Sequence, residues 1–143
     1  MAVIDQVVGK RVYFDTNIFI YIFEGSPEYQ DIVMPLIALA ESDDIAIFTN
    51  EITLGELLVS PFKNQQKEIA DTYIQALNNP DFVTLGSTTQ HIHIEAARIR
   101  ATYGMKYPDA VHIASAIDSA CDVFLTNDRK IKAVSNLEMV YCS

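Results

Sequence analysis

Four acidic residues of this chain stand in sequence surroundings that are otherwise apolar: Asp15, Glu56, Asp109 and Asp128. Asp15 and Asp128 each follow a short run of β-branched and aromatic residues, which predicts that both lie at the ends of strands. Glu56 and Asp109 lie in apolar segments with helical patterns. If folding brings these four carboxylates together, they repel and raise one another's pKa values unless a cation neutralises them. We call this set the acidic quartet.

The ligand type predicts which cation the acidic quartet would hold. Oxygen-only ligands favour Mg²⁺ or Mn²⁺, and the sequence has no convincing His/Cys cluster of the kind that binds Zn²⁺. A hard divalent ion lowers the pKa of bound water and stabilises the charge that builds on a phosphodiester during cleavage. Hydrolysis of phosphodiester bonds is therefore the natural reaction class.

Each acid also has an ordinary structural interpretation. Asp15 and Asp128 could be turn residues or helix caps, because Asp is common at both kinds of position. Asp109 could complement the dipole of the helix that it begins, and Glu56 could point to solvent. The four acids together are more specific for a metal site than any one of them.

Five β-rich runs alternate with segments of helical pattern. The runs span residues 11–15, 45–49, 82–85, 123–126 and 138–141. This alternation predicts an α/β protein with a parallel sheet covered by helices. Ligands bind beyond the carboxyl ends of the strands in such sheets, which is where Asp15 and Asp128 are expected.

Boundary signals accompany the helical patterns. The predicted helices span approximately residues 26–40, 51–59, 69–77, 89–103 and 108–120. Ser26 and Asn50 are candidate N-caps, and the second of these helices is expected to end before Ser60 and Pro61. Gly104 is a candidate C-terminal stop, and Pro108 suits a first helical turn.

Length and composition limit the class of protein. The 143 residues suit one domain, residues 1–143, with a core of its own. Ten Lys and Arg against 19 Asp and Glu give a formal net charge of −9, so the basic surface of a nonspecific nucleic-acid-coating protein is missing. This charge does not exclude an enzyme that uses cations.

The sequence also predicts a cytoplasmic protein. No apolar stretch approaches the roughly 20 residues of a membrane-spanning helix, and the N-terminus lacks a secretory signal pattern. Cys121 and Cys142 are far apart and lack metal-site spacing, so we interpret both as small packing residues in a reducing compartment.

The motifs around the acidic quartet resemble those of a known family. They are Asp15-Thr16-Asn17, Glu56 within residues 52–59, the run Pro-Asp-Ala-Val-His-Ile-Ala at 108–114, and Thr126-Asn127-Asp128. In order and spacing they resemble PIN-domain proteins, and the compact length is most similar to the VapC toxins of toxin-antitoxin pairs. The resemblance implies a three-layer α/β/α sandwich with a central five-stranded parallel sheet in the order 3-2-1-4-5. That order would put Asp15 and Asp128 at the topological switch point.

The resemblance also implies residue roles. The acidic quartet would be catalytic and would bind Mg²⁺ or Mn²⁺, with Asn17 and Thr126 as supporting residues. The implied activity is that of an endoribonuclease, in which an activated water attacks phosphorus and leaves a 5′ phosphate and a 3′ hydroxyl. The ribose 2′ hydroxyl need not be the nucleophile.

Other polar residues receive weaker interpretations. Three basic residues could lie close to phosphate or be ordinary surface charges: Lys106, Arg129 and Lys130. His112 lies one turn from Asp109 and could touch substrate, although a packed, hydrogen-bonded helix histidine is the favoured interpretation. His91 and His93 are expected at the surface.

A toxin implies partners. Antitoxins of this family wrap the toxin and can place an Arg in the acidic pocket, which suits a chain of net charge −9. Apolar side chains of the early helices, including Phe19, Phe23 and Met34, could serve antitoxin binding or a homodimer, with core packing as the default. RNA would be the substrate.

Three alternative functions remain open. A haloacid-dehalogenase-like phosphatase would carry Asp-x-Asp after the first strand, where this chain has Asp15-Thr16-Asn17. A phospho-receiver module would pair acids near its first strand, whereas Asp43 and Asp44 precede the second predicted strand. A PIN-domain nuclease of RNA processing keeps the fold without the toxin role, and retention of all four acids argues against an inactive scaffold.

Overall fold

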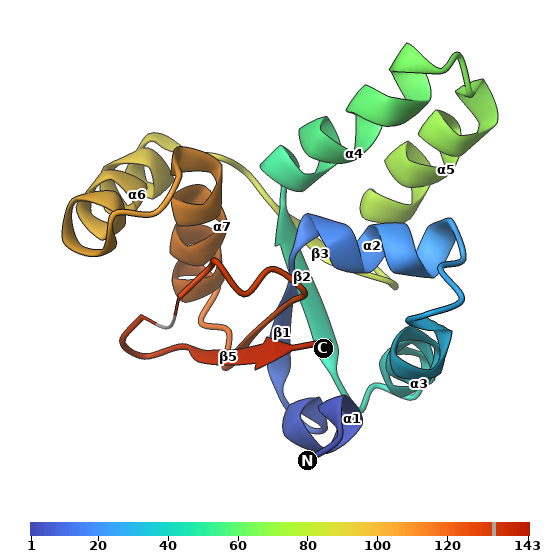
Figure 1. The fold of residues 1–143 in the computed structure, drawn as a ribbon, viewed down its shortest axis with the longest axis horizontal. Helices are drawn as coiled ribbons and strands as arrows, with labels where there is room; N and C mark the ends of the chain where they lie inside the picture. The colour runs from blue at the N-terminus through green and yellow to red at the C-terminus, as the bar shows by residue number, and fades with distance from the viewer. Residues whose placement is uncertain (133) are drawn as a thin grey trace.

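The structure, a computed structural model, describes residues 1–132 and 134–143. Its strands are β1 (Arg11–Phe14), β2 (Ala46–Asn50), β3 (Thr84–Gly86), β4 (Val123–Thr126) and β5 (Glu138–Tyr141). They form one parallel sheet in the order β3-β2-β1-β4-β5, which confirms the expected topology (Figure 1).

Helices cover both faces of this sheet. They are α1 (Val3–Val7), α2 (Thr16–Phe23), α3 (Gln30–Glu41), α4 (Glu51–Lys63), α5 (Lys67–Leu77), α6 (Gln90–Tyr103) and α7 (Tyr107–Asp118). In Figure 1, α6 and α7 lie on one side of the sheet and α2 and α3 on the other, while α4 and α5 extend beyond its end. The three-layer α/β/α sandwich is therefore confirmed.

Alternation along the central strands divides the core between the two faces. Val12 and Phe14 of β1 pack into the core that contains α2, α3 and α5, whereas Tyr13 packs against α6 and α7. In β4, Leu125 faces the first side and Phe124 the second, with the Phe124 ring stacked on Tyr13 at 5.2 Å between centroids. Successive strand residues point to opposite faces, so both must be apolar where helices cover both.

Most boundary signals are confirmed. Asn50 Oδ1 accepts from the Ile52 amide at the start of α4, and the Thr89 hydroxyl accepts from the Ile92 amide at the start of α6. Gly104 ends α6 in the left-handed region, with φ of 73°. The cysteines also match the expectation, because both are buried, and burial raises the thiol pKa of Cys121 to about 12 and that of Cys142 to about 11.

Two predicted helix boundaries are wrong. Ser26 does not cap α3, which begins at Gln30, because residues 26–29 form a turn and Tyr29 stacks on Tyr21 at 4.1 Å between ring centroids. Helix α4 does not stop before its proline but continues to Lys63. Pro61 is buried within it, and the packing of α4 on α5 outweighs the backbone hydrogen bond that proline removes.

Helix α2 has no counterpart among the predicted helices. It is short and mostly apolar, and pattern alone does not distinguish such a run of about eight residues from a buried strand. Asp15 supplies its N-cap, since the carboxylate accepts from the Thr16 amide. None of the helices in the described part of the chain has both the length and the apolar character that a membrane span requires.

Two glycines provide a matched test of the backbone. Gly55 lies in the middle of α4 with open space where a Cβ would stand, so Gly55→Ala should raise the free energy of unfolding by about 0.5–1 kcal/mol. Gly104 has a positive φ, so Gly104→Ala should lower the free energy of unfolding by about 1–2 kcal/mol, although the added Cβ would meet no neighbouring atom. Urea denaturation measures both. Equal effects of the two substitutions would contradict the assigned conformations.

Candidate functional site

The first and last acids of the quartet lie side by side at the carboxyl edge of the sheet. Asp15 directly follows β1 and Asp128 lies just beyond β4, and these two strands are neighbours. The Asp15 amide donates to the carbonyl of Leu125 at 3.0 Å, which continues the pairing of the two strands by one residue. This is the switch point of the sheet, where the order of the strands reverses.

Thr126 links the two strand ends. Its hydroxyl donates to Asp15 Oδ2 at 2.6 Å and accepts from the Asp128 amide at 3.0 Å, and the side chain is fully buried. The other oxygen of Asp15, Oδ1, accepts from the Thr16 amide at 2.8 Å. Asp15 is only 6% exposed, so these hydrogen bonds replace the water that a buried carboxylate loses.

His112 lies between two carboxylates of the quartet. It projects from α7, is 1% exposed, and its Nδ1 lies 2.8 Å from the hydroxyl of the buried Tyr13. Its Nε2 donates to Glu56 Oε1 at 2.6 Å, because a carboxylate can only accept, and lies 3.8 Å from Asp15 Oδ1. The Thr16 hydroxyl donates to the same oxygen of Glu56 at 2.7 Å. His112 thus fixes the direction of the Glu56 side chain.

These contacts keep Glu56 ionised. Partial burial on its own raises the pKa of this carboxyl, but the hydrogen bond and positive charge of His112, with the Thr16 hydroxyl, hold the pKa below its ordinary value. Glu56 belongs to α4, which follows β2, whereas Asp15 and Asp128 follow β1 and β4. Its carboxylate therefore reaches the site from a helix and not from a strand end.

Asp109 has the opposite electrostatic environment. Burial raises its pKa, and the negative charges of Asp15 and Asp128 raise it further. The charge of His112 lowers this pKa in part, while that of Glu56 adds to the increase. All three other members of the quartet therefore act on Asp109, which the first turn of α7 presents to the same edge of the sheet.

The donor set suits a hard divalent cation. The quartet offers carboxylate oxygens alone, and the repulsion that raises the pKa of Asp109 is what such an ion would relieve. Glu56 bonds instead to His112 and Thr16, and across residues 1–132 and 134–143 no group of three or more acidic, His or Cys side chains stands ready as a metal site. Both of these hydrogen bonds of Glu56 use Oε1, so they leave Oε2 for a cation.

Asn17 and Asn127 hold the loop that carries Asp128. Asn17 Oδ1 accepts from the Asn127 amide at 3.3 Å. The Asn127 side chain donates to the hydroxyls of Tyr21 and Tyr29 at 2.9 and 2.8 Å, and it accepts from the Ser143 hydroxyl. The loop is thus tied to α2, to the start of α3 and to the end of the chain.

The favoured interpretation of the sequence gave His112 no role in the site, with contact to substrate as the alternative. It is the buried, hydrogen-bonded histidine expected, but its partner is Glu56. Its position three residues after Asp109 was the available signal, because residues i and i+3 share a helix face. Thr16 lies inside the first motif, but apart from its hydroxyl nothing in the sequence indicated that it contacts Glu56.

The basic candidates divide into two groups. Arg129 donates to the Ser143 carbonyl and lies 4.6 Å above the Tyr141 ring, so it fastens the end of the chain. Lys106 and Lys130 are exposed. Lys106 is the N-cap residue of α7, and the Lys130 amide donates to Asp128 Oδ1 at 2.9 Å. The surface positions expected for the other two histidines, His91 and His93, are confirmed.

Comparisons with known proteins agree with this fold. A sequence model of the PIN domain matches residues 12–137. The chain is similar to a toxin-antitoxin complex from Klebsiella pneumoniae, with 22% identity, a TM-score of 0.66, and coverage of 92% of this chain and 98% of that one. It is also similar to VapBC2 from Rickettsia felis bound to a DNA fragment from its promoter, with 19% identity, a TM-score of 0.71, and coverage of 92% and 98%.

FitAcB from Neisseria gonorrhoeae is a further structural neighbour, with 16% identity, a TM-score of 0.68, and coverage of 92% of this chain and 97% of that one. At these identities the likeness is one of fold. The comparison with curated proteins finds no matching sequence.

Asp109→Asn tests the repulsion within the site. A raised pKa means that the folded protein binds the Asp109 proton more tightly than the unfolded chain, so the ionised group disfavours folding at pH above that pKa. In EDTA at pH 7 the variant should therefore be more stable than the parent. The gain should vanish as pH falls below about 4, the ordinary pKa of Asp.

Urea denaturation across pH 3–8 measures this difference in stability. Asp81→Asn, at an exposed loop position, is the control and should change stability by less than about 0.5 kcal/mol. An Asp109→Asn variant that is equally or less stable at pH 7 would show that the charges do not oppose folding.

Proposed function

Because the chain belongs to the PIN domain family, we propose that it is a Mg²⁺- or Mn²⁺-dependent endoribonuclease and the toxin of a VapBC-type toxin-antitoxin pair. The observation that carries the proposal is the hydrogen-bonded network that gathers three acids at one edge of the sheet. Thr126 links Asp15 to the Asp128 amide, and His112 lies between Asp15 and Glu56. The raised pKa of Asp109 agrees with this arrangement. Carboxylates gathered at a switch point are arranged for a cation and a phosphate.

In this proposal the acidic quartet holds the cation and is catalytic. When bound, a divalent ion supplies a Lewis acid that polarises the phosphodiester and lowers the pKa of a coordinated water. Thr126 and the Thr16 amide each bond to one oxygen of Asp15, so they fix the carboxylate and leave its remaining lone pairs free. Asn17 supports the same edge through the Asn127 amide.

His112 acts in this proposal as a positioning residue. Its Nε2 holds Glu56 in an ionised form at the edge of the site. The Tyr13 hydroxyl in turn fixes the orientation of the imidazole ring from within the core. Because His112 and Tyr13 are both buried, the orientation of Glu56 is linked to the packing between β1 and α7.

The phosphatase and the phospho-receiver module, the two alternatives from other families, have less support. A haloacid-dehalogenase-like phosphatase needs an acid two places after its nucleophile, where Asn17 instead accepts a backbone hydrogen bond. A phospho-receiver would need its paired acids near Asp15. Asp43 and Asp44 precede β2 and so lie at the amino edge of the parallel sheet, where the Asp44 carbonyl accepts from the Gly9 amide.

RNA cleavage tests the nuclease proposal. The chain should cleave RNA in Mg²⁺ or Mn²⁺ and not in EDTA, and the products should carry 5′ phosphates. Asp15→Asn and Glu56→Gln should each lower the rate at least about 100-fold, because each removes charge that the transition state uses. The assay follows fragments of a labelled RNA on gels.

Glu68→Gln is the matched control, since Glu68 is an exposed acid on α5. Cleavage in EDTA, or full activity of the Asp15 and Glu56 variants, would overturn the nuclease mechanism. Release of inorganic phosphate from a small phosphomonoester would favour the phosphatase instead.

The proposed partner is a basic antitoxin. The net charge of −9 suits a cationic protein, and an Arg of that protein would find carboxylates at the acidic edge. An apolar hollow of about 340 Å³ lies between α2, α3 and α5, where Phe23 lines the wall and Met34 is 50% exposed. Phe19, in contrast, is fully buried and belongs to the core.

Copurification tests the partner. A tagged chain expressed in its own host should bring down one basic protein in equal amount, and Met34→Glu should reduce that yield because it puts a charge into the apolar hollow. Val59→Glu, at a position 65% exposed on α4, is the control. Equal yields of the partner from both variants would exclude this hollow as the antitoxin-binding site. Purification of the chain without any partner would favour a nuclease of RNA processing.

The remaining proposals concern assembly and location. We place the activity in the cytoplasm, where RNA is the accessible substrate, and assign it to one domain of residues 1–143. A homodimer is proposed as the free form, so light scattering should give twice the 16.0 kDa of one chain.

A further inference from the structure

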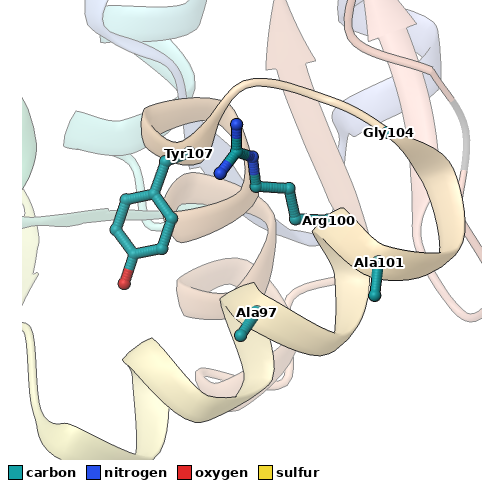
Figure 2. A pocket seen from close by; sticks show the side chains of 5 residues that line it. All are labelled: Ala97, Arg100, Ala101, Gly104 and Tyr107. Atoms are coloured by element: carbon teal, nitrogen blue, oxygen red, sulfur yellow. The ribbon is translucent and has the colours of Figure 1, made fainter.

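A hollow of about 480 Å³ lies between α6 and the start of α7. It is lined by Ala97, Arg100, Ala101, Gly104 and Tyr107 (Figure 2). Ala97 and Ala101 are one helical turn apart and Gly104 has no side chain, so these small residues leave the space that forms the hollow. Arg100 and Tyr107 rise beside it, and Figure 2 shows the guanidinium extending from α6 on the side where the Tyr107 ring lies.

Arg100 is an oriented cation with free donors. Its Nε donates to the Met105 carbonyl at 3.2 Å, which fixes the plane of the guanidinium. The terminal nitrogens can then donate to a ligand. Within residues 1–132 and 134–143 no acidic side chain forms an ion pair with Arg100. Arg98, two residues earlier, pairs with Glu95 at 3.3 Å. Arg100 is therefore available for a ligand anion, whereas Arg98 is already paired.

Tyr107 is a rigid, partly exposed aromatic wall. Its ring stacks on His93, with 5.9 Å between centroids and 7° between planes, and its hydroxyl bonds to His93 Nδ1. The side chain remains 37% exposed. A ring that is already ordered loses little entropy when a base stacks on it, and stacking on exposed aromatics is a common way to hold unpaired bases.

The hollow lies close to the acidic quartet but on another side of α7. Tyr107 and Asp109 share the first turn of this helix, and residues two apart point to opposite sides, so their side chains are separated by roughly one helix diameter, about 10 Å. A stacked strand advances about 3.4 Å per nucleotide. A strand cleaved at the acidic quartet would thus bring a nucleotide about three places away to the hollow, past the exposed Lys106.

We propose that the hollow between α6 and α7 binds one nucleotide of single-stranded RNA, with its base on Tyr107 and its phosphate on Arg100. This inference rests on the proposed ribonuclease function and adds to it a substrate-binding site outside the acidic edge. In a chain of net charge −9, an unpaired arginine beside an aromatic ring marks where a polyanion can approach. An acidic peptide would satisfy Arg100 but would leave the Tyr107 ring without a base.

Equilibrium binding of a labelled 12-nucleotide RNA in EDTA tests the site, because binding is then measured without cleavage. Arg100→Gln should weaken binding and lower the slope of log Kd against log salt by about 0.7, the value of one phosphate contact on a single strand. Tyr107→Ala should weaken binding roughly 5- to 100-fold with the slope unchanged. Tyr107→Phe keeps the ring and should bind within about threefold of the parent.

Ala97→Leu provides a second, independent variant. Ala97 is exposed, so a larger side chain fills the hollow without disturbing the core, and RNA binding should weaken. Arg98→Gln and Phe62→Ala are the controls for charge and for an exposed aromatic, since Phe62 is 63% exposed on α4. Both should bind RNA as the parent does. Thermal unfolding verifies that every variant is folded.

Four results would overturn the inference. These are unchanged binding in Tyr107→Ala or Ala97→Leu, an Arg98→Gln effect equal to that of Arg100→Gln, equal competition by an acidic peptide, and competition by a mononucleotide as strong as that by the RNA. The last would identify a free-nucleotide site instead. Failure of this proposal can be distinguished from failure of the proposed ribonuclease function. If the parent cleaves RNA and the variants bind RNA as the parent does, only the nucleotide site in the hollow is refuted.

Discussion

Asp15 and Asp109 carry negative charge into a partly buried edge of the sheet, where water solvates them poorly and each carboxylate raises the energy of the other. The surrounding structure compensates for this with fixed donors. Thr126 and the Thr16 amide bond to Asp15, and His112 bonds to Glu56. For Asp109 the charge of His112 compensates only in part, and the pKa of this carboxyl stays raised.

The same interactions connect the site to the core. The threonine that holds Asp15 is the last residue of β4, and the ring that holds Glu56 is in contact with Tyr13 in the middle of β1. Tyr13 also stacks on Phe124 of the neighbouring strand. Stability and site geometry therefore depend on the same buried residues, a coupling expected where a fold tolerates unfavourable charge for function.

Much of the architecture was predictable because strand and helix signals were strong. Alternating β-rich runs and helical patterns indicated a covered parallel sheet, and the caps at Asn50 and Gly104 lie where the signals placed them. The errors have physical causes. Helix α2 is a short, mostly apolar run that pattern alone does not distinguish from a buried strand. Pro61 lies inside α4 because tertiary packing outweighs a local helix-breaking signal.

The positions of the first and last acids at strand ends were predictable from the sequence, the contacts around them were not, and the roles of the acidic quartet stay a prediction. Strand-end position identified Asp15 and Asp128, since parallel strands present their carboxyl ends together. The hydrogen bond from His112 to Glu56 joins residues 56 positions apart, and no local pattern encodes such a pair. The hollow beside Tyr107 likewise depends on how α6 lies against α7.

The most direct test of the central claim is the affinity of the purified full chain for Mn²⁺, measured by titration calorimetry. If the acidic quartet holds one cation jointly, the parent binds Mn²⁺, Asp109→Asn weakens that binding at least about tenfold, and Thr126→Val weakens it through Asp15. Equal Mn²⁺ affinity in the parent and in Asp109→Asn would contradict the account.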